Sequence, residues 1–228
     1  MEFKNKINII QNLIRSKNFS IAVVNCKKLL KKYPDNSYTL NLCGLALQGD
    51  KKFSMSLEYF YRALATEPNN TAALNNMGNS YKALYNYDKA EETYLRLLQI
   101  EPKNFKVLNN YANLKQTLND FKGAIELLLK AQEIKPQEPV TLFGLSASYQ
   151  SVGDFEKSKE IANEILKLDH KKTSAHKLIS GYTKYKDRNE EHLKVMEKLL
   201  QEDLTDPQKI DLFFALGKAY EDIKDYKK

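Results

Sequence analysis

The sequence predicts an all-α fold, a right-handed α-solenoid built from repeated helical hairpins. A constant spacing of 34 residues separates four prolines, Pro34, Pro68, Pro102 and Pro136. Small residues recur early in each block, and an aromatic residue recurs later in it: Gly44, Gly78, Ala112 and Ser146, then Phe53, Tyr87, Phe121 and Phe155. Small residues let two helices cross closely, and a proline ends a helix. This periodicity indicates one helical unit copied along the chain.

The composition favours a folded protein, and its cysteines and histidines give no sign of a metal or catalytic site. Hydrophobic residues make up 42% of the chain and charged residues 29%, which suits a continuous core. No apolar run reaches the roughly 18 residues of a membrane span, and the first residues do not resemble a signal peptide. We therefore expect a cytoplasmic protein with no membrane partner. The two cysteines and three histidines have no metal-ligand spacing and no candidate nucleophile beside them, so we expect no metal, no cofactor and no catalytic residue.

The positive charge is concentrated at the start of the chain. The net charge is +7, and residues 1–34 alone contain eight Lys or Arg residues and one Glu. Lys27, Lys28, Lys31 and Lys32 share the end of one predicted helix, where cations suit the helix dipole. A nucleic-acid surface would interleave Arg and aromatic residues along a groove. We therefore predict a solvated basic cap and no nucleic-acid partner.

The period defines the repeats. The first, 1–36, is degenerate, and the regular repeats are 37–70, 71–104, 105–138 and 139–172. In 71–104 the predicted first helix carries Leu74, Met77, Gly78 and Tyr81, and the second carries Tyr87, Ala90, Tyr94 and Leu97. Apolar residues at this spacing lie on one face of a helix. Each repeat is therefore expected to be a hairpin of two amphipathic helices.

The last third departs from the period. His170 stands where the next proline is expected, and Pro207 follows it after 37 residues, so 173–209 is predicted to be an irregular hairpin. The residues Phe213, Leu216, Gly217, Tyr220 and Tyr226 then restore the first-helix pattern within 210–228. No second helix follows before Lys228. We therefore expect one of two situations: this chain is part of a longer protein, or its last helix pairs with another partner. Self-association through the incomplete repeat 210–228 is one form of the second situation.

The sequence resembles the tetratricopeptide repeat (TPR) family, most specifically in residues 71–104 and 105–138. The resemblance rests on the small residue of the first helix, a Tyr one turn later, the aromatic after the turn, alanines on the second helix and the closing proline. It implies a solenoid whose concave face, lined by the first helix of each repeat, binds proteins or extended peptides. The first hypothesis is accordingly a TPR scaffold for protein–protein interaction, without enzymatic activity in this chain.

The stretch from Ala175 to Tyr226, above all residues 212–222, is similar to the TPR region of bacterial TPR-sulfotransferase proteins. That resemblance implies an alternative function, in which this chain is the substrate-presenting arm of a sulfotransferase whose catalytic domain lies beyond it. Such a domain would transfer a sulfuryl group from a phosphoadenosine-phosphosulfate donor. The pair Gly44 and Gly49 lies inside a predicted hairpin and cannot form the phosphate loop that this chemistry requires.

Asparagines recur on the predicted groove side of the first helices. The candidate binding residues are Asn41, Asn75, Asn76, Asn79, Lys82, Lys106, Asn109, Asn110, Asn113 and Gln116. Asparagine is a poor helix former, so its recurrence on successive helices suggests a structural or binding role. Asparagines at equivalent positions of successive first helices form rows. These rows resemble the asparagine ladder in the TPR arm of O-linked N-acetylglucosamine transferases, which implies that they bind the backbone of an extended peptide. Two alternatives stay open: Asn is abundant throughout the chain, and amides can serve only to link repeats.

Overall fold

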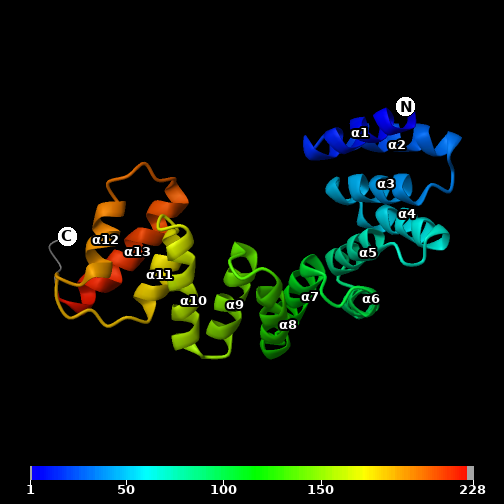
Figure 1. The fold of residues 1–228 in the computed structure, drawn as a ribbon. Helices are drawn as coiled ribbons and strands as arrows, with labels where there is room; N and C mark the ends of the chain where they lie inside the picture. The colour runs from blue at the N-terminus through cyan, green and yellow to red at the C-terminus, as the bar shows by residue number, and fades with distance from the viewer. Residues whose placement is uncertain (1, 225–228) are drawn as a thin grey trace. The chain divides into compact units, whose positions relative to one another are not determined.

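The computed structural model describes residues 2–224, which form thirteen α-helices and no strand (Figure 1). The predicted all-α repeat fold is confirmed. The chain divides into two compact units, Met1–Leu114 and Lys115–Lys228. Each unit is built of helical hairpins.

The first unit contains three hairpins and most of a seventh helix. Its helices are α1 (Glu2–Arg15), α2 (Phe19–Lys32), α3 (Ser37–Gly49), α4 (Phe53–Thr66), α5 (Thr71–Ala83), α6 (Tyr87–Ile100) and the first ten residues of α7 (Phe105–Thr117). Within the hairpins α1 packs on α2, α3 on α4 and α5 on α6. Contacts of α2 with α3 and of α4 with α5 join successive hairpins, so the core runs along the stack.

Glycines allow the close helix crossings that the sequence predicts. Phe60 and Tyr94, from the second helices, are fully buried and lie over Gly44 and Gly78 of the first helices. A Cβ atom at Gly78 would lie 2.6 Å from the Tyr94 ring, closer than real contacts allow. The aromatic ring therefore occupies the space that a larger side chain would need.

A residue in the left-handed conformation follows the first helix of each of the first five hairpins. Positive φ values recur at intervals of 34 residues, at Lys17, Lys51, Tyr85, Asn119 and Gly153, and again at Lys224. Only one of these six residues is glycine, the residue that adopts this conformation without steric cost. The repeated tight turn is therefore imposed by helix packing at a local cost in backbone strain.

The second unit begins in the last turn of α7. Its further helices are α8 (Phe121–Ile134), α9 (Pro139–Ser151), α10 (Phe155–Leu168), α11 (Thr173–Gly181), α12 (Glu191–Leu199) and α13 (Asp206–Asp222). One cluster of buried residues packs α9 and α10 against α11, and a second one joins α12 to α13 with Tyr185 and Leu204 from the connecting segments. Helix α13 also packs on α11.

The start of α13 differs from the pattern that the prolines suggest. Pro207 lies in the first turn of α13 and does not end a second helix, as its resemblance to the earlier prolines implied. Thr205 and Gln208 form a capping box there, and proline is well tolerated in a first helical turn. The helix consequently begins at Asp206, four residues before the boundary expected at 210. Tyr226, part of the expected pattern, lies outside the described residues.

Candidate functional site

The candidate binding residues lie on three first helices. Asn41 is on α3, four residues from Asn75 to Lys82 are on α5, and the others are on α7. Nine of the ten belong to the first unit, whereas Gln116 belongs to the second. Most of the amides in the first unit are half-buried. Asn41 is only 6% exposed, while Lys106 and Asn113 are exposed.

Two amide pairs link successive first helices. The Nδ2 of Asn76 donates to the Oδ1 of Asn41 at 3.0 Å, and the Nδ2 of Asn110 donates to the Oδ1 of Asn75 at 2.8 Å. Each bond joins two asparagines that are 35 positions apart. Equivalent positions of successive repeats are 34 positions apart, so the bonded asparagines are not at equivalent positions. Each amide has two N–H donors and an oxygen with two lone pairs. The bonds therefore fix the orientation of the amides and leave part of their hydrogen-bonding capacity unused.

A buried tyrosine holds a third amide. The hydroxyl of Tyr94 donates to the Oδ1 of Asn79 at 2.6 Å, and burial of the Tyr94 ring raises the pKa of its hydroxyl. Lys82 donates to the Oδ1 of Asn113. Burial lowers the pKa of Lys82. Amides on α5 and α7 thus have fixed positions on the first-helix face of the first unit.

Other predicted residues bond elsewhere. The Nδ2 of Asn109 donates to the Phe105 carbonyl of its own helix at 2.9 Å. In the second unit, the Nε2 of Gln116 donates to the Gly144 carbonyl at 2.9 Å and to the Oγ of Ser148 at 2.7 Å. Gln116 therefore ties the end of α7 to α9.

Gln48, which was not predicted as a site residue, makes the same two bonds in the first unit. Its Nε2 donates to the Asn76 carbonyl and to the Oγ of Ser80, both at 2.9 Å. A glutamine followed 32 residues later by a serine is the sequence signal for this link.

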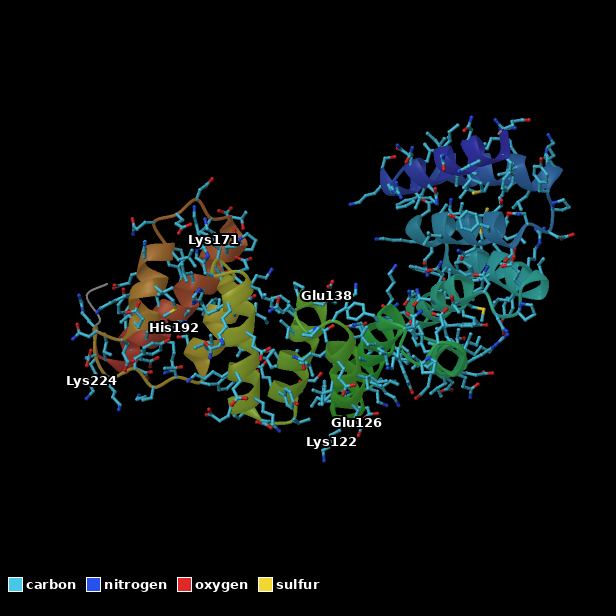
Figure 2. The ribbon with its side chains drawn as sticks, viewed as in Figure 1. Lys122, Glu126, Glu138, Lys171, His192 and Lys224 are labelled. Carbon is cyan, nitrogen blue, oxygen red and sulfur yellow. The ribbon has the colours of Figure 1, made fainter. Side chains whose placement is uncertain are left out.

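The second unit contains a histidine pair that sequence reasoning did not find. His192 on α12 lies beside α11 (Figure 2), with its Nε2 2.9 Å from the Nδ1 of His176. The Nε2 of His176 lies 2.9 Å from the His170 carbonyl, and the Nδ1 of His192 lies 2.5 Å from the Tyr185 hydroxyl. A carbonyl only accepts hydrogen bonds, so His176 donates to it through Nε2. The lowered pKa values of His176 and His192 favour neutral rings, and in that state the Nδ1 of His176 accepts from His192, while the Nδ1 of His192 accepts from Tyr185. Both rings are neutral in this arrangement, and burial lowers the pKa of His192 to about 4.

The first helices of the second unit also line an open pocket of about 530 Å³. Gln150 of α9, Lys177 and Tyr182 of the α11 region, and Phe214 and Lys218 of α13 surround it. Lys177 lies over the Phe214 ring, 4.9 Å from its centroid, and forms an ion pair with Asp211 at 2.9 Å. The pocket thus combines aromatic surface with lysines that are already paired with carboxylates.

The described residues contain no group of three or more His, Cys, Asp or Glu side chains arranged to hold a metal ion. Between residues 2 and 224, no helix is long and apolar enough to cross a bilayer.

Comparison with known families decides what kind of array this is. Residues 5–140 match the family model described as "Psidin, N-terminal TPR repeats region". The chain belongs to this TPR family. The TPR resemblance drawn from the repeated motif is thereby confirmed, and a TPR scaffold supports a role in protein interaction. A comparison with curated proteins finds no match.

Solved TPR structures share the fold at low sequence identity. A TPR protein from Parabacteroides merdae is 18% identical with a TM-score of 0.68, covering 98% of this chain and 87% of its own. The pilF protein of Pseudomonas aeruginosa is 15% identical with a TM-score of 0.72, covering 99% and 96%. YrrB, described as a TPR protein with an unusual peptide-binding site, is 16% identical with a TM-score of 0.64, covering 84% and 96%.

Proposed function

We propose that this TPR chain is a scaffold that binds an extended peptide segment of a partner protein along the first-helix face of its first unit. Asn75, Asn76, Asn79 and Asn110 are the proposed contacts, with Lys82, Lys106 and Asn113 at the margin. The observation that carries the proposal is that neighbouring side chains orient the amides of Asn76, Asn79 and Asn110 while these residues remain half-exposed. A preorganised donor or acceptor loses little side-chain entropy when it binds a ligand.

The spacing of the helices suits a peptide backbone. Packed helices lie about 8–10 Å apart, and an extended peptide advances about 3.3 Å per residue. One amide from each successive first helix can therefore meet about every third peptide residue. An amide both donates and accepts, so it can bond a backbone N–H or C=O whatever the peptide side chain is. Lys106 adds positive charge, which favours acidic side chains in the peptide.

Asn41 and Asn109 have supporting roles in this proposal. Asn41 is buried and positions Asn76, while Asn109 bonds its own helix. Gln116 serves as a link between repeats in the second unit. The fold of YrrB, whose description names a peptide-binding site, is consistent with this use of a TPR array.

The test separates ligand contact from repeat linkage. A peptide is selected from a random library on the wild-type chain, and its affinity is measured by calorimetry for Asn76→Ala and Asn41→Ala. Both changes break the same bond, but only the first removes a proposed contact. We expect Asn76→Ala to weaken binding at least about tenfold, as loss of one well-placed hydrogen bond does, and Asn41→Ala to weaken it less.

The control is Asn163→Ala, an exposed asparagine on α10 of the second unit, which should leave the affinity unchanged. Circular dichroism verifies that all three variants are folded. Equal losses for Asn76→Ala and Asn41→Ala would show that the amides only join repeats. A library that yields no binder would also count against the proposal.

A further inference from the structure

We infer that the chain associates head to tail with a second copy of itself, through the exposed face of α2 in one copy and the exposed face of α13 in the next. This contact uses none of the amides proposed to bind peptide, so it goes beyond the proposed function. It rests on two exposed helix faces that complement each other in apolar content, charge and spacing.

The first face is on α13. Ile210, Phe213 and Gly217 follow each other at three- and four-residue intervals and so lie on one side of the helix. Phe213 is 56% exposed, and a Cβ at Gly217 would meet no atom within 4 Å. On α5, the corresponding glycine, Gly78, is covered by Tyr94 from the helix that follows. The α13 face therefore has the form that elsewhere in this chain receives another helix.

The second face is on α2. Ile21, Val24, Lys28 and Lys31 share one side of this helix, and all four are exposed. Lys28 stands 34 residues before Arg62, which donates to the Pro34 carbonyl of the preceding repeat at 2.9 Å. Arg96 makes the equivalent bond to the Pro68 carbonyl at 2.6 Å. The equivalent positions of α4 and α6 are exposed as well, but they include Glu58 and Glu92, whereas on α2 these four positions carry only apolar and basic side chains.

The two helices carry opposite charge. Helix α2 contains four lysines and no acidic residue, whereas α13 contains four acidic residues and two lysines. Asp206 and Glu221 lie on the same side of α13 as Ile210 and Phe213, so carboxylates flank its apolar centre. On α2, lysines follow the apolar pair Ile21 and Val24. Complementary charge around an apolar centre favours association between the two faces and disfavours pairing of either face with itself.

The spacing of these groups also agrees. Lys31 is seven residues from Val24, and Asp206 is seven residues from Phe213, which is about 10 Å along each helix. In an antiparallel arrangement, Val24 on Phe213 brings Lys31 opposite Asp206 and Ile21 next to Gly217. Lys28 then lies level with Lys209, so the charge match of this register rests on Lys31 and Asp206. Because the two faces differ, the contact is heterologous, and each copy keeps one face free for the next.

The first experiment follows the mass of the full chain by light scattering from about 10 µM to about 1 mM, a range that covers weak dissociation constants. We expect the wild-type mass to rise with concentration and to fall back at high salt, since ion pairs are screened. Lys31→Glu and Asp206→Lys should each weaken association by at least about tenfold. The double variant, with both changes in one chain, should restore it because the charges are exchanged. A wild-type chain that stays monomeric throughout the range overturns the inference.

Mixing two variants tests the head-to-tail geometry. Val24→Asp removes only the α2 face and Phe213→Asp only the α13 face, so each variant alone should stay monomeric. An equal mixture should form dimers and nothing larger, because each variant supplies the face that the other lacks. Tyr85→Asp, at an exposed turn residue outside both faces, should associate like the wild type. Thermal unfolding by circular dichroism verifies that all variants fold; a mixture that stays monomeric, or a Val24→Asp chain that still self-associates, contradicts the inference.

Discussion

Asn110 donates a hydrogen bond to Asn75 across 35 residues of a chain whose period is 34. Asn76 makes the same bond to Asn41. The sequence separation of the bonded asparagines exceeds the repeat length by one residue. A first helix with a neighbour on both sides therefore needs two adjacent asparagines, one that accepts from the next first helix and one that donates to the preceding one. Asn75 and Asn76 are such a pair. On α3, Asn41 is followed by Leu42, so that helix supplies only the acceptor.

Loss of one of these amides should weaken the stack. Asn76→Ala removes the donor to Asn41, whose side chain is buried, and should lower the free energy of unfolding by about 1–2 kcal/mol. Urea unfolding followed by circular dichroism measures this. Asn163→Ala, on an exposed helix surface, should have no effect or raise stability slightly through its better helix propensity. A cost equal to that of Asn163→Ala would mean that the amide bond contributes nothing to stability.

Two glycines on first helices should respond in opposite ways to alanine. Gly78→Ala places a methyl group against the buried Tyr94 ring and should lower the free energy of unfolding by about 1–3 kcal/mol. Gly217→Ala meets no neighbour and should raise it by about 0.5–1 kcal/mol through the entropy of the unfolded chain. Thermal unfolding of both variants provides the comparison. If both changes stabilised the chain, helix propensity would outweigh the close crossing at Gly78.

The left-handed turn residues offer a way to stabilise the chain. Tyr85 has a φ of 59° and an exposed side chain, so Tyr85→Gly should relieve backbone strain and raise the free energy of unfolding by about 0.5–1 kcal/mol. Gln99→Gly, at an exposed position within α6, should instead lower it, because glycine is unfavourable inside a helix. Chemical denaturation of the two variants gives the sign directly. A loss of stability in Tyr85→Gly would indicate that the Tyr85 ring, which packs edge-on against Tyr87, matters more than the strain.

The histidine pair should make the second unit sensitive to acid. Burial lowers the pKa of His176, and burial together with the neighbouring His176 and Lys159 lowers the pKa of His192 to about 4. The unfolded chain therefore takes up protons first as the pH falls. The stability that depends on the neutral rings is complete above about pH 6.5 and is lost as the pH falls toward about 4, at a cost of about 3 kcal/mol for His192.

Urea unfolding at a series of pH values measures this loss. His192→Phe removes one of the titrating rings and should flatten the dependence between pH 6.5 and pH 4, although the variant is less stable because Tyr185 and His176 lose a partner. The slope, and not the absolute stability, is the readout. Equal slopes for the wild type and His192→Phe would show that this pair does not control acid sensitivity.

The period of the prolines was sufficient to predict the helical hairpins, because apolar spacing and small crossing residues are properties of single helices and their immediate partners. The start of α13 was missed because Pro207 suits either the end of one helix or the first turn of another, and only the capping box formed by Thr205 and Gln208 decides between them. His176 and His192 are 16 residues apart on different helices. Their contact could not be predicted, because the connection between the two helices does not follow the repeat pattern. The peptide-binding role of the amide rows and the sulfotransferase alternative stay predictions.

The one-residue offset of the amide bonds bears on how such an array can grow. Residues 71–104 carry both an acceptor, Asn75, and a donor, Asn76, so a chain with this segment duplicated would form the same amide bond once more at the new junction. Residues 37–70 lack a donor after Asn41, and a duplicate of that segment would leave its junction without the bond. The segment 71–104 is therefore the natural unit of insertion for lengthening this protein by design.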